Sequence, residues 1–161
     1  TMSMQAARAH LAKFGLEGRI REFSVSSATV ELAAVAVGCE PARIAKSLSF
    51  LVEDTPILIL AAGDAKVDNP RYKTRFGTKA KMIPADQVEE LIGHGVGGVC
   101  PFGTKPGVTV YLDESLRRFE VVYPAAGTPA SAVELNLAEL EQASSASGWV
   151  DVCKGWRPEQ S

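Results

Sequence analysis

The chain has 161 residues, of which 46% are apolar and 22% are charged, and its formal net charge is -2. This composition is typical of a globular protein, and the net charge excludes a globally basic nucleic-acid-binding protein. Its three cysteines are widely spaced without a CxxC motif, so we expect neither a disulfide framework nor a zinc site.

The length predicts one domain that covers residues 1–161 and buries a core without disulfides or metals. The longest apolar run, residues 56–62, is too short to span a membrane. The N-terminal residues lack the basic, apolar, small-residue order of a signal peptide. We therefore expect a cytoplasmic protein with no cofactor, no metal and no membrane contact.

The N-terminal half predicts helices first and then a β-hairpin. A serine N-cap at Ser27 and Gly38 at the end bound the second helix, and Pro41 opens the third. Two apolar runs separated by Asp54 and Thr55 are typical of a hairpin. The expected elements are helices at residues 3–14, 27–37 and 41–45, strands at 48–52 and 56–62, and a helix capped at 68 or 69 that stops at 77.

The C-terminal half mixes strands and helices without a regular βαβ repeat. We expect strands at residues 79–83, 108–112, 120–123, 131–135 and 149–153, and helices from 84 to 92 and from 137 to 143. Residues 93–107 are rich in glycine and too irregular for either period. The order predicts an α+β fold, with a mixed, mostly antiparallel sheet curled toward a barrel and surrounded by helices.

The segment of residues 93–103, GHGVGGVCPFG, contains five glycines in eleven positions. Such density indicates unusual backbone angles or a close approach to the main chain. Its exposed N–H groups could stabilise the oxyanion of an acyl-transfer reaction, and Pro101 would stiffen the loop. A mobile surface loop is the alternative, but long irregular loops in compact domains are often functional.

Two other features have a structural and a functional interpretation. Lys46 lies in a locally apolar stretch, where it either snorkels from a strand edge or presents its ammonium group inside a cleft. The turn at residues 125–129, AAGTP, is either a plain strand connection or a bend that lines a pocket.

Taken in order, these segments resemble the YbaK/ProX family of editing deacylases. The resemblance runs through PARIAKSL at residues 41–48, VD at 67–68, GGVCPFG at 97–103, AG at 126–127 and VDV at 150–152. It implies a mixed sheet or barrel with surrounding helices. It also implies hydrolysis of the ester between a wrong amino acid and the terminal adenosine of a tRNA. The implied partners are the acceptor end of aminoacyl-tRNA and, as a second candidate, prolyl-tRNA synthetase.

The resemblance assigns the essential lysine to Lys46 and the pocket loop to Gly97, Gly98, Pro101 and Gly103, with Gly127 in the later turn. Many relatives carry serine in place of Cys100, a difference that bears on amino-acid preference. We expect three groups of site residues: catalytic Lys46, Gly98, Cys100, Pro101 and Gly103; substrate-binding Gly97, Val99, Phe102, Gly127 and Thr128; and tRNA-binding Lys66, Arg71, Lys73 and Arg75.

The expected mechanism uses placement rather than strong acid or base groups. A water attacks the ester carbonyl, N–H groups of residues 98–103 polarise its oxygen, and Lys46 holds the terminal phosphate or the aminoacyl end. The adjacent ribose hydroxyl assists the water, as the resemblance implies. A pocket that admits only small amino acids, such as alanine or cysteine on tRNA for proline, would supply the selectivity.

Other interpretations stay open at this point. A covalent mechanism would pair Cys100 with His94, although six residues of glycine-rich loop predict no defined geometry between them. The basic residues 66–81 suit tRNA binding or a solvated surface. The same fold could be a non-catalytic tRNA- or synthetase-binding module, or a hydrolase of other small esters or amides.

Overall fold

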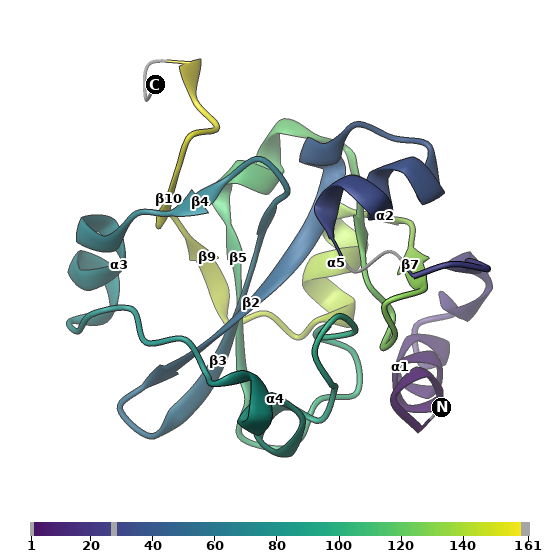
Figure 1. The fold of residues 1–161 in the computed structure, drawn as a ribbon, viewed down its shortest axis with the longest axis horizontal. Coiled ribbons are helices and arrows are strands. Elements are labelled where there is room, and N and C mark those ends of the chain that lie inside the picture. Colours follow the sequence, from purple (N-terminus) through teal and green to yellow (C-terminus); the bar gives the residue numbers. More distant parts are fainter. Residues whose placement is uncertain (1, 27–28, 159–161) are drawn as a thin grey trace.

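The computed structural model describes residues 2–26 and 29–158 (Figure 1). Its α-helices are α1 Met2–Ala12, α2 Val30–Val37, α3 Asn69–Phe76, α4 Ala85–Ile92 and α5 Leu137–Ala143. Short 3-10 helices occupy Glu17–Arg19, Pro41–Arg43 and Glu114–Arg118. The strands are β1 Ile20–Glu22, β2 Ile44–Val52, β3 Thr55–Ala62, β4 Lys66–Val67, β5 Thr109–Asp113, β6 Val121–Pro124, β7 Ser131–Val133, β8 Leu135–Asn136, β9 Gly148–Val150 and β10 Cys153–Lys154.

The largest sheet has the strand order β8-β6-β2-β3-β5-β9. Within it, β2–β3 and β6–β8 are antiparallel, whereas β2–β6, β3–β5 and β5–β9 are parallel. Two antiparallel ribbons, β1–β7 and β4–β10, lie beside it. The predicted α+β fold with a mixed, curled sheet among helices is confirmed, and four of the seven pairings among the described strands are antiparallel.

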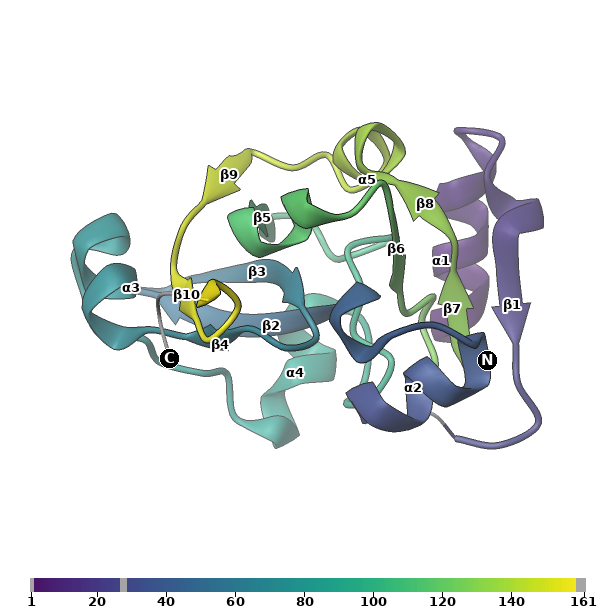
Figure 2. The same ribbon diagram turned by 90° about the horizontal axis from the view of Figure 1, so that it is seen from above.

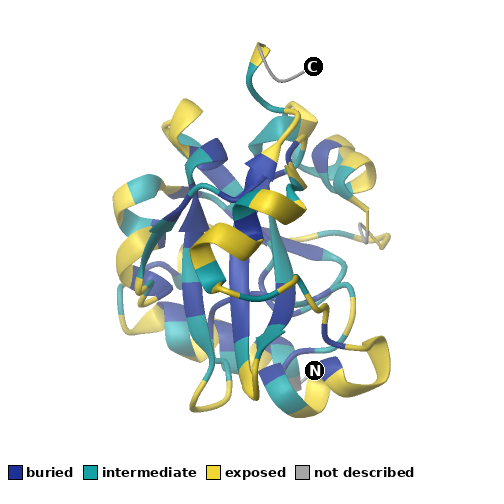
Figure 3. Ribbon diagram, turned by 90° about the vertical axis from the view of Figure 1, so that its left-hand side faces the viewer, coloured by how far each residue is buried: buried dark blue, intermediate teal, exposed yellow. Residues whose placement is uncertain are grey.

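The helices lie around this sheet. Figures 1 and 2 show α3 at one end of the molecule, α1 at the other, and α2 and α4 between them along β2. Figure 3 shows buried residues along the central strands and exposed residues on the outer faces of the helices. No helix in the described part of the chain is long and apolar enough to cross a membrane.

Local signals bound the helices much as the sequence predicts. Gly38 and Gly77 end α2 and α3 in the left-handed conformation, with φ angles of 85° and 76°. Asn136 and Glu139 form a capping box at the start of α5. The expected cap Ser27 lies outside the described residues, and Thr29 caps α2 by accepting a hydrogen bond from Leu32 N.

Tertiary pairing changed several predicted elements. The helix expected at 41–45 was wrong beyond Arg43, because Ile44 and the next residue pair with β6 and start β2. The strand expected at 79–83 is reduced to one bridge between Met82 and Phe50, since Pro84 has no N–H to extend the ladder.

Two predicted strands are each split because the chain changes partner. Residues 131–135 form β7, which pairs with β1, and β8, which pairs with β6. Residues 149–153 likewise divide between β9, on β5, and β10, on β4. The three-residue β1 and two-residue β4 were not predicted, because such short strands carry no detectable alternation.

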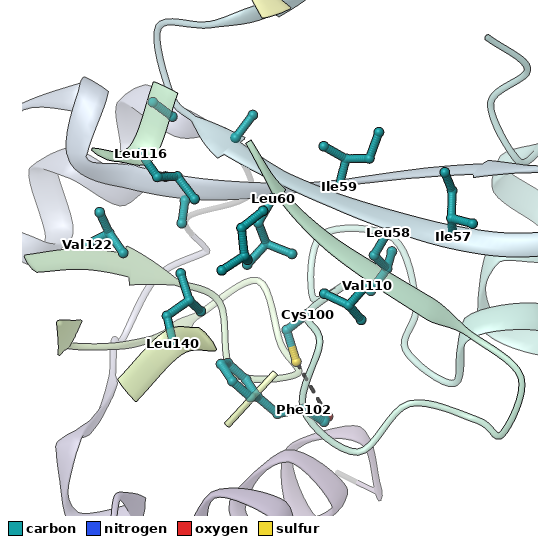
Figure 4. Close-up of a cluster of buried hydrophobic side chains, with 14 of the residues drawn as sticks. Ile57, Leu58, Ile59, Leu60, Cys100, Phe102, Val110, Leu116, Val122 and Leu140 are labelled. Atoms are coloured by element: carbon teal, nitrogen blue, oxygen red, sulfur yellow. Dashed lines mark hydrogen bonds between the residues drawn. The ribbon is translucent and has the colours of Figure 1, made fainter. Parts of the chain in front are cut away.

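The core packs the glycine-rich loop against the β2–β3 hairpin. Leu58 and Leu60 of β3 are fully buried and point toward Cys100 and Phe102 of the loop (Figure 4). Ile59 points away from the loop, on the opposite face of the hairpin. The loop is therefore held by apolar packing, although it has no regular secondary structure.

Candidate active site

A cavity of about 450 Å³ opens beside β2. Four further segments complete its wall: the start of α2, the stretch around the start of α4, the loop at residues 96–99 and the turn at residues 123–132. Most lining side chains are apolar, and a volume of this size is typical of small-molecule sites. The polar side chains in this wall therefore become the candidates for chemistry.

Strand β2 places neighbouring side chains on opposite sides of the hairpin. In the antiparallel ladder with β3, Lys46 lies opposite Ala61 and Ser47 lies opposite Leu60. Directly opposed residues share a face, so Ser47 emerges on the loop side with Leu60, and Lys46 emerges on the other side. Both residues belong to the cavity wall.

The ammonium group of Lys46 is bound by main-chain carbonyls. Its Nζ donates to the carbonyl of Gly63 at 3.4 Å and to the carbonyl of Ala65. Burial lowers the pKa of Lys46, while the negative charge of Asp64 acts in the opposite direction. The ammonium group of Lys46 is therefore fixed at the edge of the cavity. It does not extend into solvent, and it does not face the loop directly.

Ser47 is a candidate site residue that sequence reasoning missed. Its Oγ is buried and has no hydrogen-bond partner among the described residues. A buried, unpaired hydroxyl costs about 1–3 kcal/mol, which a ligand in the cavity could offset. The sequence carried no signal for it, because residue 47 lies outside the strand predicted at 48–52 and the face of a side chain is known only once its strand is known.

The loop reaches the cavity through Gly97 and Val99, two of the residues predicted to bind substrate. Gly97 has a φ of 90°, a left-handed conformation that favours glycine. Gly98 does not line the cavity, and a Cβ there would lie 2.5 Å from the carbonyl oxygen of Gly127. Its N–H donates to the carbonyl of Gly95 at 3.0 Å, so this donor is already used within the loop.

Helix α1 supports the loop and the turn from behind. A Cβ at Gly103 would lie 2.7 Å from the carbonyl oxygen of Ala6, and one at Gly127 would lie 2.5 Å from that of Ser3. Neither glycine lines the cavity. These two predicted site residues therefore allow the close approach of main chains that sets the position of the pocket wall.

Pro101, Phe102 and Cys100 are buried in the core rather than placed in the cavity wall. Cys100 Sγ lies 3.5 Å from His94 Nε2, so the sequence-based expectation of no defined geometry was wrong. Burial raises the pKa of the Cys100 thiol to about 12 and lowers that of His94. Neither a thiolate nor an open path to the cavity supports a nucleophilic role for this pair.

His94 instead ties the loop to α1. Its Nε2 is 2.6 Å from the carbonyl oxygen of Phe102 and its Nδ1 is 2.5 Å from Ser3 Oγ. The carbonyl can only accept, so Nε2 carries the proton and Ser3 donates to Nδ1. In the described part of the chain, no three His, Cys, Asp or Glu side chains gather to bind a metal ion.

The turn after β6 is organised by a buried serine. Ser131 Oγ accepts from Ala126 N at 3.1 Å and donates to the carbonyl of Thr128 at 3.0 Å. Thr128 lines the cavity, as expected for a substrate-binding residue, and so does Ser131, which was not predicted. The turn is thereby held against the loop through the contact between Gly127 and Gly98.

The four basic residues predicted to bind tRNA lie outside the cavity wall and are divided between two places. Lys66 is exposed on β4, next to the carbonyl that binds Lys46. The other three lie on α3, where Arg71 pairs with carboxylates, Lys73 is exposed and Arg75 stacks on aromatic rings.

A curled mixed sheet with a cavity between one strand and a glycine-rich loop defines a class of α+β domains. The family model described as the aminoacyl-tRNA editing domain matches residues 25–143. A crystal structure described as that of a proposed trans-editing enzyme for prolyl tRNA synthetase is 30% identical and superposes with a TM-score of 0.86. The match covers 96% of this chain and 99% of that one.

Two curated relatives are similar to this chain over different shares of its length. YwhH of Bacillus subtilis (strain 168), an uncharacterized protein, is 50% identical over 96% of this chain and 99% of its own length. A proline--tRNA ligase of Limosilactobacillus fermentum is 28% identical over 55% of this chain, which spans 17% of that enzyme. The chain belongs to the aminoacyl-tRNA editing domain family, which confirms the YbaK/ProX resemblance.

Proposed function

We propose that this protein is a trans-editing deacylase that hydrolyses the ester of a mischarged tRNA, with tRNA for proline carrying a small amino acid as the substrate. The family supports the reaction class, and the similarity to proline--tRNA ligases supports the tRNA. The acceptor end of the tRNA is the proposed partner, prolyl-tRNA synthetase is a candidate docking partner, and the cytoplasm is the compartment where all three would meet.

The observation that carries the proposal is the unpaired hydroxyl of Ser47 in a mostly apolar cavity. In this mechanism a water attacks the ester carbonyl while Ser47 and main-chain N–H groups near Val99 polarise its oxygen. Because the Lys46 ammonium group emerges on the other face of β2, we assign it to the terminal phosphate rather than to the carbonyl. The neighbouring ribose hydroxyl assists the water.

The remaining predicted residues then act by shaping the pocket. Gly97, Val99 and Thr128 contact the aminoacyl group from the cavity wall. Gly98, Gly103 and Gly127 permit the close main-chain contacts behind that wall. Cys100, Pro101 and Phe102 hold the loop in the core. The small cavity would reject larger amino acids by size.

A panel of mischarged tRNAs, followed by loss of the ester, tests the proposal. We expect turnover of at least one tRNA that carries a small amino acid, and a fall of about 10- to 100-fold in kcat/KM for Ser47→Ala, the effect of one lost hydrogen bond to the reacting group. Ser144→Ala is the matched control, since this buried serine lies at the end of α5 and donates to Glu141.

Two outcomes would favour the other interpretations. Binding of tRNA without turnover of any member of the panel would indicate the non-catalytic module. Hydrolysis of small esters or amides with no preference for the tRNA-linked form would indicate a different hydrolase. Full activity in Lys46→Ala would remove Lys46 from the mechanism.

A further inference from the structure

A basic patch surrounds the β4–β10 ribbon, although the protein as a whole has a net charge of -2. Its core is a pair of lysines, Lys66 on β4 and Lys154 on β10, which lie directly opposite each other in the antiparallel ladder. Both are exposed, and neither forms an ion pair with any described carboxylate. Like charges in directly opposite positions repel each other and destabilise the ribbon, and a bound anion would remove this repulsion.

The nearby carboxylates do not offset this charge, because arginines already bind them. Asp64 pairs with Arg118 at 2.6 Å, and Asp151 pairs with Arg71 at 3.3 Å and with Arg157 at 2.9 Å. Asp68 pairs with Arg71 at 3.5 Å, and buried Asp113 accepts hydrogen bonds from main-chain N–H groups. We name the β4–β10 patch by its six basic side chains in the described chain: Lys46, Lys66, Arg71, Arg118, Lys154 and Arg157.

The patch is continuous with the cavity through the turn before β4. Lys46, part of the cavity wall, donates to the carbonyl of Ala65, and the next residue is Lys66. Burial is the main cause of the lowered pKa of Lys46, and the positive charge of Lys66 acts in the same direction. A polyanion seated on the ribbon would therefore enter the cavity past Lys46.

An aromatic ring also belongs to this surface. Half-buried Trp156 lies against the guanidinium groups of Arg118 and Arg157, at 5.2 and 4.1 Å from the ring centre. Basic side chains that bind the backbone, together with an aromatic ring on which a base can stack, are typical of surfaces that bind single-stranded nucleic acid, such as the end of a tRNA, whereas an acidic peptide needs no stacking partner.

We propose that the β4–β10 patch binds the phosphates of the RNA strand whose end enters the cavity, with Lys66 and Lys154 as direct phosphate contacts. This inference rests on the proposed function and deepens it. Of the predicted tRNA-binding residues, Lys66 is retained, and Lys154 is added. The two lysines are 88 residues apart in the sequence, and only the pairing of β4 with β10 brings them side by side.

The test compares K66Q/K154Q with the control K13Q/K105Q, which removes two exposed lysines elsewhere. An unacylated acceptor-stem minihelix ending in CCA is the binding probe, titrated by fluorescence anisotropy between about 50 and 200 mM KCl. We expect K66Q/K154Q to weaken binding roughly five- to tenfold per lysine and to reduce the slope of log Kd against log salt by about 1.5. The control should match the wild type.

A second measurement separates this inference from the proposed function. Removing two phosphate contacts should lower hydrolysis of aminoacyl-tRNA more than hydrolysis of aminoacyl-adenosine, which lacks the phosphates. Unfolding temperature should stay constant or rise, because the cross-strand repulsion is gone. Weakened RNA binding in a protein that hydrolyses no ester would refute the proposed function alone. Unchanged affinity and salt slope in K66Q/K154Q would overturn the patch as an RNA site.

Discussion

Arg118 binds Asp64 through two hydrogen bonds, with Nη1–Oδ2 and Nη2–Oδ1 distances of 2.9 and 2.6 Å. Asp64 lies between Gly63 and Ala65, the two residues whose carbonyls accept hydrogen bonds from Lys46. This bidentate pair therefore fixes the turn that positions the Lys46 ammonium group, so Arg118 acts on the candidate active site without touching it.

We expect Arg118→Lys to lower kcat/KM for mischarged tRNA about tenfold, or about 1.4 kcal/mol. Lysine keeps the charge but cannot make the fork-shaped contact with Asp64, so the turn and Lys46 lose their fixed position. Arg117→Lys is the matched control, because Arg117 pairs with Glu114 instead. Wild-type kinetics in Arg118→Lys would show that the position of the turn does not matter.

Cys100→Ser should keep deacylase activity within about threefold of wild type, because the buried thiol, with its pKa raised to about 12, supplies no thiolate at neutral pH. A serine hydroxyl can still donate to the carbonyl of Phe102, as the thiol does. In the native protein a thiol reagent should leave Cys100 unmodified until the protein unfolds. Loss of activity without loss of stability would revive the covalent mechanism.

His94 should make the stability of the fold depend on pH. Burial lowers the pKa of His94 in the folded state below its usual value near 6.5, so the unfolded chain takes up a proton first as pH falls. The contribution of His94 to the free energy of unfolding is therefore complete above its unfolded-state pKa of about 6.5. As the pH falls below that value, the free energy of unfolding decreases by up to about 1.4 kcal/mol per pH unit, until the folded-state pKa is reached. Urea unfolding between about pH 5 and 8 measures this slope, which His94→Asn should lack.

Gly98→Ala should damage both the loop and the turn. The new methyl group would lie 2.5 Å from the carbonyl oxygen of Gly127, so one main chain must move, at a cost of about 1–3 kcal/mol. Activity should fall as well, because both segments border the cavity. Gly148→Ala is the control, since a Cβ there has no neighbour within 4 Å and a positive φ is absent. Equal stability of the two variants in urea unfolding would contradict the close contact.

Much of this protein was determined by its sequence alone. Gly38 and Gly77 predicted helix ends that the structure has, because a left-handed residue is a local requirement that glycine meets best. The irregular, glycine-rich loop and the order of motifs likewise predicted the family. The roles assigned to Lys46 and the loop residues stay predictions until the substitutions are measured.

The sequence did not predict the features that depend on which distant segments pair with each other. Pairing with β6 turned Ile44 into the first residue of a strand, and pairing of β4 with β10 brought Lys154 to Lys66. Ser47 stands out only once β2 is set against β3, because a side chain's face and its missing partner are properties of the packed sheet. Local sequence encodes conformational preference, whereas these contacts arise from burial summed over residues distant in the chain.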